Sequence, residues 1–223
     1  MAQANGAAIH PARIARSRVN SCSAILLAAG QSSRMGAFKP LLPFGNKTVI
    51  ECCIDYLRKG GVDTIVVVLG HRAEEVRARL VNHDVSFAFN PDPTSEMGAS
   101  IAAGIQQLPE SAKATLIALT DHPAVPATVV KTVVEAWTNG ARLVIPTWQN
   151  RGGHPVLVDL SFKPEVLTLT SSGLRALFQN HRDEVRRIEV DSPFIARDMD
   201  TWDDYRALHQ DVTGEPAPEP PTE

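Results

Sequence analysis

Residues 24–39 read Ala24-Ile25-Leu26-Leu27-Ala28-Ala29-Gly30-Gln31-Ser32-Ser33-Arg34-Met35-Gly36-Ala37-Phe38-Lys39, an apolar run that passes into a loop of small and basic side chains. The run 24–29 does not alternate between apolar and polar residues, and it stops at Gly30. A short apolar run with such a stop is typical of a strand that is buried on both faces, as in a parallel sheet. We therefore predict a buried strand here.

The loop after this strand has the composition of a phosphate-binding loop. Its small residues would let backbone amides approach an anion closely, and they are Gly30, Ser32, Ser33 and Gly36. Arg34 and Lys39 add the positive charge that a triphosphate needs. The spacing of the two glycines excludes the dinucleotide fingerprint, and Ala37 after Gly36 excludes the P-loop. A surface loop that is merely basic is the alternative.

Strands and helices alternate along the rest of the chain. Apolar runs predict further strands at 64–69, 85–89, 114–119, 143–145, 155–158 and 185–190. Helical spacing predicts helices at 48–58, 73–80, 97–108, from 126 onward and at 174–180, and Thr201 stands where a helix N-cap is expected. This order predicts a single α/β domain, with a mostly parallel sheet and helices on both faces. Ligands of such sheets bind at the carboxyl ends of the strands.

The composition of the 223-residue chain is that of an ordinary globular protein, with 43% hydrophobic and 21% charged residues. The net charge of −3 gives no support for a nucleic-acid or membrane-surface partner, and no apolar run approaches the roughly 20 residues that span a bilayer. Three cysteines without a CxxC pair argue against a zinc or redox site and favour a reducing cytoplasm.

The two ends of the chain differ from its middle. Residues 1–20 contain three arginines and no Asp or Glu, and they lack the apolar stretch of a secretory signal. We expect a disordered lead there, with a targeting segment as the alternative. Residues 212–223 are rich in Pro and Glu, so we expect a disordered tail and a folded domain at 21–211.

The loop and four later segments resemble one family. Residues 27–43 resemble the signature loop of the nucleotidyltransferase superfamily, within which the chain is most similar to the molybdenum-cofactor cytidylyltransferase group. The later segments resemble motifs of that group across nearly the whole folded span: Asn90-Pro91 with Glu96-Met97-Gly98-Ala99-Ser100-Ile101, Thr120-Asp121-His122-Pro123-Ala124-Val125, Arg151-Gly152-Gly153-His154-Pro155-Val156-Leu157, and Asp198-Met199-Asp200-Thr201-Trp202-Asp203-Asp204. The chain departs from the group at Phe38, where Asn or Asp is common, in the shortened serine run 98–100, and at Trp202, where the group has Pro.

This resemblance implies a Rossmann-like nucleotidyltransferase fold and the transfer of a nucleoside monophosphate to a phosphorylated acceptor, with release of pyrophosphate. CTP is the implied donor, molybdopterin or the molybdenum cofactor the implied acceptor, and Mg²⁺ the implied cofactor. Arg34 would contact the β- and γ-phosphates, and Lys39 would lie nearer the α-phosphate, where charge builds up in the transition state. The implied nucleotide-binding residues are Leu27, Ala28, Ala29, Gly30, Ser32, Ser33, Gly36, Gly98 and Ser100.

Acidic residues at predicted strand ends are the candidates for the metal. Asp121 follows the strand at 114–119, so its carboxylate can face the loop and bind Mg²⁺, with a turn aspartate before Pro123 as the alternative. Asp198 and Asp200 would point the same way in an extended stretch, and one of them would complete the site. The resemblance favours Asp200, which could instead serve only at the start of a helix.

His154 is the candidate for contact with the acceptor substrate. It follows Gly153 and precedes Pro155 in the motif 151–157. A buried histidine that is simply hydrogen-bonded is the alternative.

Three other functions stay open. The acceptor could be a sugar phosphate or another small phosphate. The protein could be a non-catalytic insertion factor that carries a cofactor to a molybdenum enzyme, which would bind substrate without releasing pyrophosphate. It could also be a nicotinamide-dependent oxidoreductase, against which the spacing of Gly30 and Gly36 argues.

Overall fold

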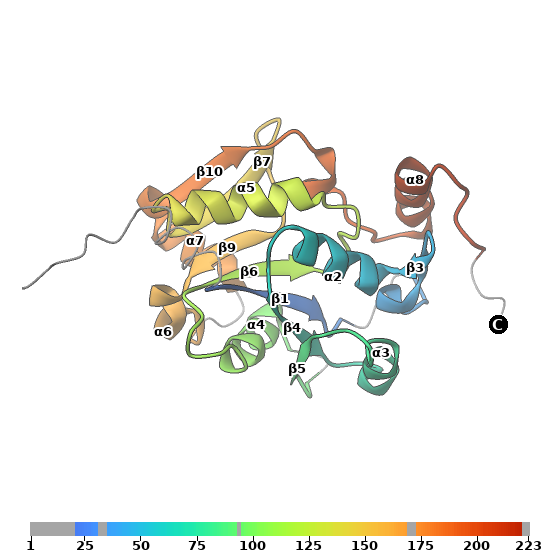
Figure 1. The fold of residues 1–223 in the computed structure, drawn as a ribbon, viewed down its shortest axis with the longest axis horizontal. Helices are drawn as coiled ribbons and strands as arrows, with labels where there is room; N and C mark the ends of the chain where they lie inside the picture. The colour runs from blue at the N-terminus through green and yellow to red at the C-terminus, as the bar shows by residue number, and fades with distance from the viewer. Residues whose placement is uncertain (1–20, 31–34, 93–94, 169–172, 220–223) are drawn as a thin grey trace, which may run out of the picture.

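The computed structural model describes residues 21–30, 35–92, 95–168 and 173–219. Its centre is a sheet of eight strands, in the order β10-β7-β9-β6-β1-β4-β5 with β8 paired to β7 (Figure 1). The strands are β1 (Cys22–Ala28), β4 (Thr64–Leu69), β5 (Ser86–Phe89), β6 (Ala114–Leu119), β7 (Leu143–Trp148), β8 (Arg151–Gly152), β9 (Val156–Asp159) and β10 (Val185–Glu189). A separate two-stranded hairpin pairs β2 (Pro43–Phe44) with β3 (Lys47–Thr48).

Most neighbouring strands of the large sheet run parallel. β1 pairs in parallel with β4 and β6, β4 with β5, and β7 with β10. β9 runs antiparallel between β6 and β7, and β8 is antiparallel to β7. The predicted mostly parallel α/β fold is therefore confirmed, with one antiparallel strand in the interior of the sheet.

The position of β1 explains why its sequence does not alternate. Every residue of this strand is buried. Leu26 and its neighbours on one face belong to a core with helices α2 (Val49–Lys59), α3 (Ala73–Arg79) and α5 (Ala127–Thr138). Ile25 and Leu27 belong to a core on the other face, with α4 (Met97–Gln106), α6 (Lys163–Val166) and α7 (Gly173–Asn180). A strand between two helical layers must be apolar on both sides.

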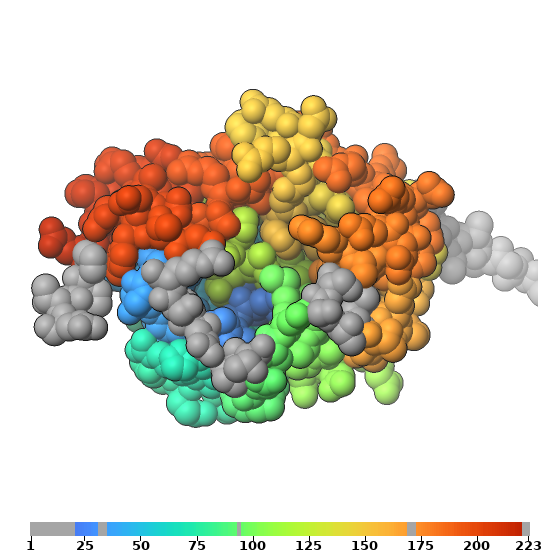
Figure 2. Space-filling view, turned by 180° about the vertical axis from the view of Figure 1, so that it is seen from behind, coloured from blue at the N-terminus to red at the C-terminus, as the bar shows by residue number. Residues whose placement is uncertain are grey.

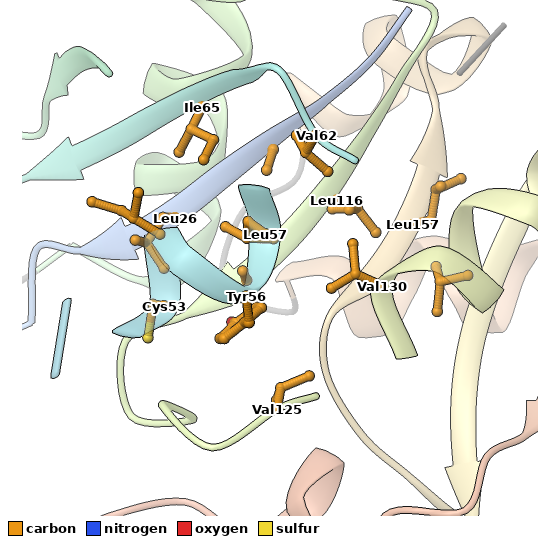
Figure 3. Close-up of a cluster of buried hydrophobic side chains, with 14 of the residues drawn as sticks. Leu26, Cys53, Tyr56, Leu57, Val62, Ile65, Leu116, Val125, Val130 and Leu157 are labelled. Carbon is orange, nitrogen blue, oxygen red and sulfur yellow. The ribbon is translucent and has the colours of Figure 1, made fainter. Parts of the chain in front are cut away.

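The core under α2 and α5 is made of closely packed aliphatic and small side chains. Figure 3 shows Leu57 of α2 between Leu26 of β1 and Leu116 of β6, with Val130 of α5 near Leu116 and Cys53 one turn earlier on α2. All five side chains are fully buried. Burial of this kind is the main stabilising contribution to such a fold.

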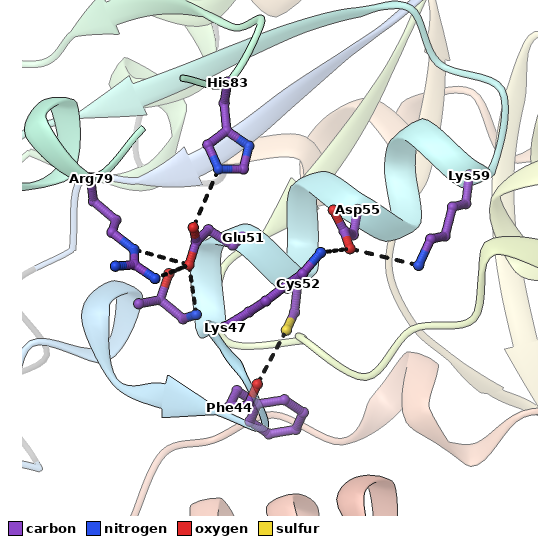
Figure 4. Close-up of polar contacts among 9 residues, drawn as sticks. Phe44, Lys47, Glu51, Cys52, Asp55, Lys59, Arg79 and His83 are labelled. Atoms are coloured by element: carbon purple, nitrogen blue, oxygen red, sulfur yellow. Dashed lines mark hydrogen bonds and ion pairs between the residues drawn. The ribbon is translucent and has the colours of Figure 1, made fainter. Parts of the chain in front are cut away.

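Hydrogen bonds and ion pairs fix the start of α2. Thr48 and Glu51 form a capping box, and Arg79 of α3 and His83 also reach the Glu51 carboxylate (Figure 4). Glu51 Oε2 accepts from the Thr48 amide at 2.8 Å and from Arg79 at 2.7 Å. Burial raises the pKa of Glu51, but the hydrogen bonds outweigh burial and lower the pKa to about 2. This acid therefore joins α2 to α3.

A third core connects the first loop with the end of the chain. It joins the β2–β3 hairpin to α8 (Trp202–Thr213), and its buried members are Met35, Leu42, Phe44, Val49, Met199, Tyr205 and Leu208. The Thr201 side chain accepts from the Asp204 amide, which confirms the predicted N-cap. The helix reaches Thr213, two residues beyond the expected domain end at 211. Glu215 follows, and its carbonyl lies 3.0 Å from Nδ1 of His209.

The predicted elements differ from the structure mainly at their ends. α4 stops at Gln106 rather than at 108, and Pro126 is the N-cap of α5 rather than its first residue. β7 continues to Trp148, although we expected it to stop before Pro146. On one edge, β7 pairs with β9 as far as Val144 and with β8 from Thr147 onward. Pro146 lies in the gap between these two pairings, so its missing N–H breaks no ladder hydrogen bond there.

Short helical turns connect several of these elements: η1 (Lys39–Leu41), η2 (Leu160–Phe162), η3 (Arg182–Glu184) and η4 (Pro193–Ala196). None of the helices in the described ranges has the length and apolar character needed to cross a bilayer.

Candidate active site

A cavity of about 280 Å³ opens at the carboxyl ends of the central strands. Leu27, Ala29 and Gly30 line it from the end of β1, and Thr120 and Asp121 from the end of β6. Its other lining residues are Lys39, Pro40, Asn90, Asp92, Ser95, Met97, Ser100 and Leu119. Figure 2 shows the hollow on this face, with atoms from the blue N-terminal part of the chain at its floor. This is the place where parallel α/β sheets bind ligands.

Lys39 is brought into the cavity by η1, directly after the loop. Its Nζ donates to Oδ1 of Asp200 at 2.8 Å, and the lysine side chain is only 11% exposed. The structure thus joins two residues that the sequence placed in separate motifs. Asp200 does not cap α8, because Thr201 and Asp204 form the capping box.

Asp121 lies across the cavity with one carboxylate oxygen that has no hydrogen-bond partner in the described part of the chain. This oxygen, Oδ1, is buried, and His122 Nε2 lies 3.6 Å away. Burial raises the pKa of Asp121, the charges of His122 and Lys39 oppose that rise, and the acids Asp198 and Asp200 add to it. A buried carboxylate oxygen without a partner is costly unless a cation or a donor binds it.

The second acidic pair is held beside Asp121 by the backbone. The Met199 amide donates to the Asp121 carbonyl at 3.0 Å. Asp198 and Asp200 flank Met199 in the sequence, so this hydrogen bond keeps both aspartates near Asp121. Asp198 is exposed, whereas Asp200 is half-buried and bonded to Lys39. In the described ranges, no three Asp, Glu, His or Cys side chains already converge in a ligand shell.

These residues fit a divalent cation. Among the described residues the buried Oδ1 of Asp121 has no hydrogen-bond partner, and hard carboxylate oxygens are what Mg²⁺ and Mn²⁺ bind. Asp121 would hold the ion, with Asp198 or Asp200 as the second ligand.

The comparisons with known proteins identify the family of this chain. The family model of the MobA-like NTP transferase domain matches residues 24–185, which include β1, the loop and Asp121. The chain belongs to the MobA-like NTP transferase family. It is therefore a nucleotidyltransferase by family, and nucleotidyltransferases of this family depend on a divalent metal.

Two relatives align with this NTP transferase over nearly their whole length. Nicotine blue oxidoreductase of Paenarthrobacter nicotinovorans is 30% identical over 195 residues, covering 82% of this chain and 95% of the relative. Molybdenum cofactor cytidylyltransferase of Escherichia coli K12 is 24% identical over 191 residues, covering 84% and 95%. The manganese complex of Rv0371C from Mycobacterium tuberculosis H37Rv has a TM-score of 0.75 at 26% identity, covering 86% of this chain and all of that one (100%).

The loop of this NTP transferase is described only at its two ends. Ser32, Ser33 and Arg34 lie outside the described residues. At the far end, Met35 is buried in the third core, and its carbonyl accepts from Nε1 of Trp202 at 2.9 Å. Gly36 has φ +63°, a conformation that favours glycine.

The predicted nucleotide-binding residues divide into two groups in the structure. Leu27, Ala29, Gly30 and Ser100 line the cavity. Ala28, Gly36 and Gly98 do not line it: Ala28 packs in the first core, Gly98 is buried in α4, and Gly36 lies in a different hollow beside Trp202. Their assigned roles remain predictions.

Asn90 is a site residue for which we predicted no role. It is 7% exposed, and its Nδ2 donates to Ser95 Oγ at 2.7 Å and to Ser100 Oγ at 2.9 Å. Asn90 thereby fixes the wall of the cavity between β5 and α4. The Asn90-Pro91 pair in the family motif was the signal that could have identified it.

Phe38, the departure before the loop lysine, has a structural explanation. Its side chain is 6% exposed and packs edge-to-face with the His71 ring, with 5.8 Å between the two ring centroids. The guanidinium carbon of Arg72 lies 4.9 Å from the Phe38 ring centroid. An aromatic anchor here holds η1, and with it Lys39, against the loop after β4.

His154 does not line the cavity that contains Lys39 and Asp121. Its amide donates to the Ile195 carbonyl at 2.8 Å, and its ring lies 5.5 Å from the ring of His122. Burial, and then the charge of His122, lowers the pKa of His154 to about 4, so its ring is neutral at physiological pH. His154 instead lines a second cavity, to which α7, β8 and β10 also contribute residues.

Proposed function

We propose that this protein is a magnesium-dependent nucleotidyltransferase that transfers CMP from CTP to molybdopterin or the molybdenum cofactor and releases pyrophosphate. The observation that carries this proposal is that Lys39 and Asp121 line one cavity at the ends of β1 and β6, with Asp200 bonded to Lys39. Membership of an NTP transferase family supports the reaction class.

The reaction forms a bond between an acceptor oxygen and the α-phosphorus while the bond to pyrophosphate breaks and its electron pair leaves with the pyrophosphate oxygen. Lys39 stabilises the charge that builds up on the α-phosphate. Arg34, which we place at the β- and γ-phosphates, stabilises the leaving group. A bound Mg²⁺ would supply charge neutralisation at the phosphates, and Asp121 with Asp198 or Asp200 would hold it.

The choice of CTP and of a molybdenum-containing acceptor is supported by the motifs and by the cytidylyltransferase relative. A pyrophosphate-release screen tests them, with four nucleotides against several phosphorylated acceptors, in the presence and absence of Mg²⁺. We expect release only with Mg²⁺ and fastest release with CTP and a pterin phosphate. Release with a sugar phosphate instead would keep the reaction and replace the acceptor.

The second candidate function is an oxidoreductase, because the relative of 30% identity carries the name nicotine blue oxidoreductase. In that case, the cavity would bind a nicotinamide cofactor. The absorbance of NADH or NADPH, followed with a nicotine-derived dye, distinguishes the two candidates: a transferase leaves the cofactor unchanged.

A non-catalytic insertion factor for a molybdenum enzyme is the third candidate. It would bind nucleotide and cofactor but release no pyrophosphate. We favour the transferase because pure carriage does not require a lysine and a metal-binding aspartate at one phosphate site. We place the reaction in the cytoplasm, in keeping with the free thiols of Cys22, Cys52 and Cys53.

A further inference from the structure

Residues 199–205 lead into α8 and contact the candidate site at several points, and we call them the bracing segment. Two of their contacts are with residues that line the cavity. The Met199 amide donates to the Asp121 carbonyl at 3.0 Å, and Asp200 accepts from Lys39 at 2.8 Å. Figure 1 shows α8 beside β3, one strand of the hairpin that follows η1. The bracing segment therefore connects the end of β6 to the chain around η1.

Trp202 makes the contact between this segment and the loop after β1. Its indole Nε1 donates to the Met35 carbonyl at 2.9 Å. Met35 follows Arg34 directly in the chain, and its side chain is buried in the third core. Met35 is thus fixed twice, through its backbone carbonyl and through its side chain, and it forms an anchored end of the loop.

Tyr205, one turn further along α8, supports the Trp202 ring. The two rings pack edge-to-face, with 5.6 Å between their centroids. The Tyr205 side chain is itself fixed, because its hydroxyl donates to the Pro43 carbonyl at 2.6 Å and the residue is only 1% exposed. Contact with a fixed neighbour restricts the rotamers of Trp202 and keeps its N–H directed at the loop.

Phe38 and Trp202 are two of the positions at which the chain departs from the cytidylyltransferase group, and both line one hollow. This hollow has a volume of about 430 Å³, and Gly36 and Ala37 also line it. Phe38 anchors η1 against the loop after β4, whereas Trp202 anchors Met35 against α8. The end of the phosphate-binding loop therefore has an aromatic anchor on each side of residues 36–37.

We propose that Trp202 is a positioning residue for the loop after β1, and that its indole N–H raises the affinity of this loop for a nucleoside triphosphate by fixing Met35. This statement rests on the proposed function, because it takes the loop as the element that binds the triphosphate. Fixing one end of a loop before binding reduces the conformational entropy that binding must remove. Lys39 keeps its own bond to Asp200, so Trp202 acts on nucleotide affinity rather than on the chemical step.

The test compares Trp202→Phe with the wild type in nucleotide binding and in turnover. Phenylalanine keeps a ring that packs on Tyr205 but has no N–H for the Met35 carbonyl. CTP, ATP, GTP and UTP, each with Mg²⁺, are titrated by calorimetry on the full-length protein. We expect the Kd and the KM of the nucleotide that binds to rise about threefold to tenfold, the fold-change of one hydrogen bond. The kcat should stay within about twofold, because losing an interaction that is equal in the ground state and the transition state raises KM alone.

Trp137→Phe is the matched control, because it also removes an indole hydrogen bond. Trp137 Nε1 donates to Asp159 Oδ2 at 2.8 Å beside a different cavity, at the opposite end of β6 from Asp121. This variant should lose stability in urea unfolding but keep the nucleotide Kd and KM of the wild type. If Trp202→Phe does not fold, Trp202→Tyr, which keeps an aromatic ring with a polar tip, is measured in the same way.

Unchanged Kd and KM in the Trp202 variant overturn the inference, and so does an equal loss of affinity in Trp137→Phe, which would indicate general destabilisation. A fall in kcat at constant KM overturns it as well. Weaker nucleotide binding in Trp202→Phe, with no pyrophosphate released by the wild type with any acceptor, supports the role of Trp202 and defeats the proposed function. Pyrophosphate release with an unchanged nucleotide KM in Trp202→Phe keeps the function and overturns the inference, and a wild type that binds none of the four nucleotides defeats both.

Discussion

Lys39 Nζ and Asp200 Oδ1 lie 2.8 Å apart, although 161 positions separate the two residues in the chain. This contact connects the loop after β1 to the segment before α8. It holds the lysine at the edge of the cavity before any phosphate is present. Pre-organised charge of this kind is a large source of rate enhancement in phosphoryl and nucleotidyl transfer.

Lys39→Ala should lower the rate of pyrophosphate release by about a hundredfold or more, the usual scale for losing one charged stabiliser. The measurement is steady-state turnover with saturating nucleotide, Mg²⁺ and acceptor. Lys47→Ala is the matched control, because Lys47 is also an ion-paired lysine but bonds to Asp55 of α2, away from the cavity (Figure 4). Full activity of Lys39→Ala would remove Lys39 from the mechanism.

Asp121→Asn should lower turnover about a hundredfold or more, yet leave the protein at least as stable as the wild type. The amide removes a charge whose burial is unfavourable, as the raised pKa of Asp121 indicates. Because the pKa of Asp121 is raised in the folded protein, its contribution to stability is present at low pH and is lost as pH rises through that pKa. The stability of Asp121→Asn relative to the wild type should therefore be greatest at neutral pH. Thermal unfolding checks this expectation, and Mg²⁺ should raise the melting temperature of the wild type only.

An Asp121→Asn protein that unfolds more readily than the wild type at neutral pH would show that the carboxylate is a structural turn residue. That was the alternative interpretation of Asp121 from its position before Pro123.

Gly30→Ala should separate nucleotide binding from folding. A Cβ atom at Gly30 would meet no atom of the described residues within 4 Å, and the φ angle of Gly30 is not in the left-handed region. We expect a change in unfolding free energy of no more than about 0.5 kcal/mol, as for ordinary surface substitutions. Nucleotide affinity should nevertheless fall about tenfold or more, because a phosphate or ribose that approaches the backbone would meet the new methyl group. Calorimetric titration with nucleotide measures this, and unchanged affinity would remove Gly30 from the binding loop.

Much of the fold could be predicted because its signals are local. The strands at 64–69 and 114–119 were predicted with the bounds that the structure gives them, since buried parallel strands are continuous apolar runs. The β2–β3 hairpin was missed because its strands have two residues each, too few for any periodicity. Its stability comes from packing against α8, which the local sequence does not encode.

The site was predictable to a lesser degree. Motif positions placed Lys39 in the loop after the first strand and Asp121 at the end of the strand 114–119, and the structure brings both to one cavity. The bond between Lys39 and Asp200 and the hydrogen bonds of Asn90 are long-range or side-chain relationships, so no spacing rule could give them. His154 was assigned to the acceptor by motif, and its location in a separate arginine-lined cavity follows from the tertiary arrangement of α7, β8 and β10 around that cavity.

Glu51→Gln should lower stability at neutral pH by about 1–2 kcal/mol, the scale of losing a helix cap and a charged hydrogen bond. The pKa of about 2 in the folded protein lies below the unfolded value. The carboxylate therefore stabilises the fold above the unfolded pKa of about 4.3, and this contribution is lost as pH falls from there toward the folded pKa. Urea unfolding across this pH range should show a shallower decline for Glu51→Gln than for the wild type.

Glu110→Gln is the control for this comparison, since Glu110 is an exposed acid between α4 and β6. Identical pH profiles for the wild type and Glu51→Gln would contradict the role of Glu51 in joining α2 to α3.

The most direct test of the central claim follows the α-phosphate itself. CTP radiolabelled in its α-phosphate is incubated with the protein, Mg²⁺ and a pterin phosphate, and the products are separated. We predict that the label appears in the acceptor in an amount equal to the pyrophosphate released, and that Asp121→Asn forms both products more slowly by about a hundredfold or more. Label that stays in CTP with every nucleotide and acceptor pair, or label transfer that is unchanged in Asp121→Asn, would contradict nucleotidyl transfer at this site.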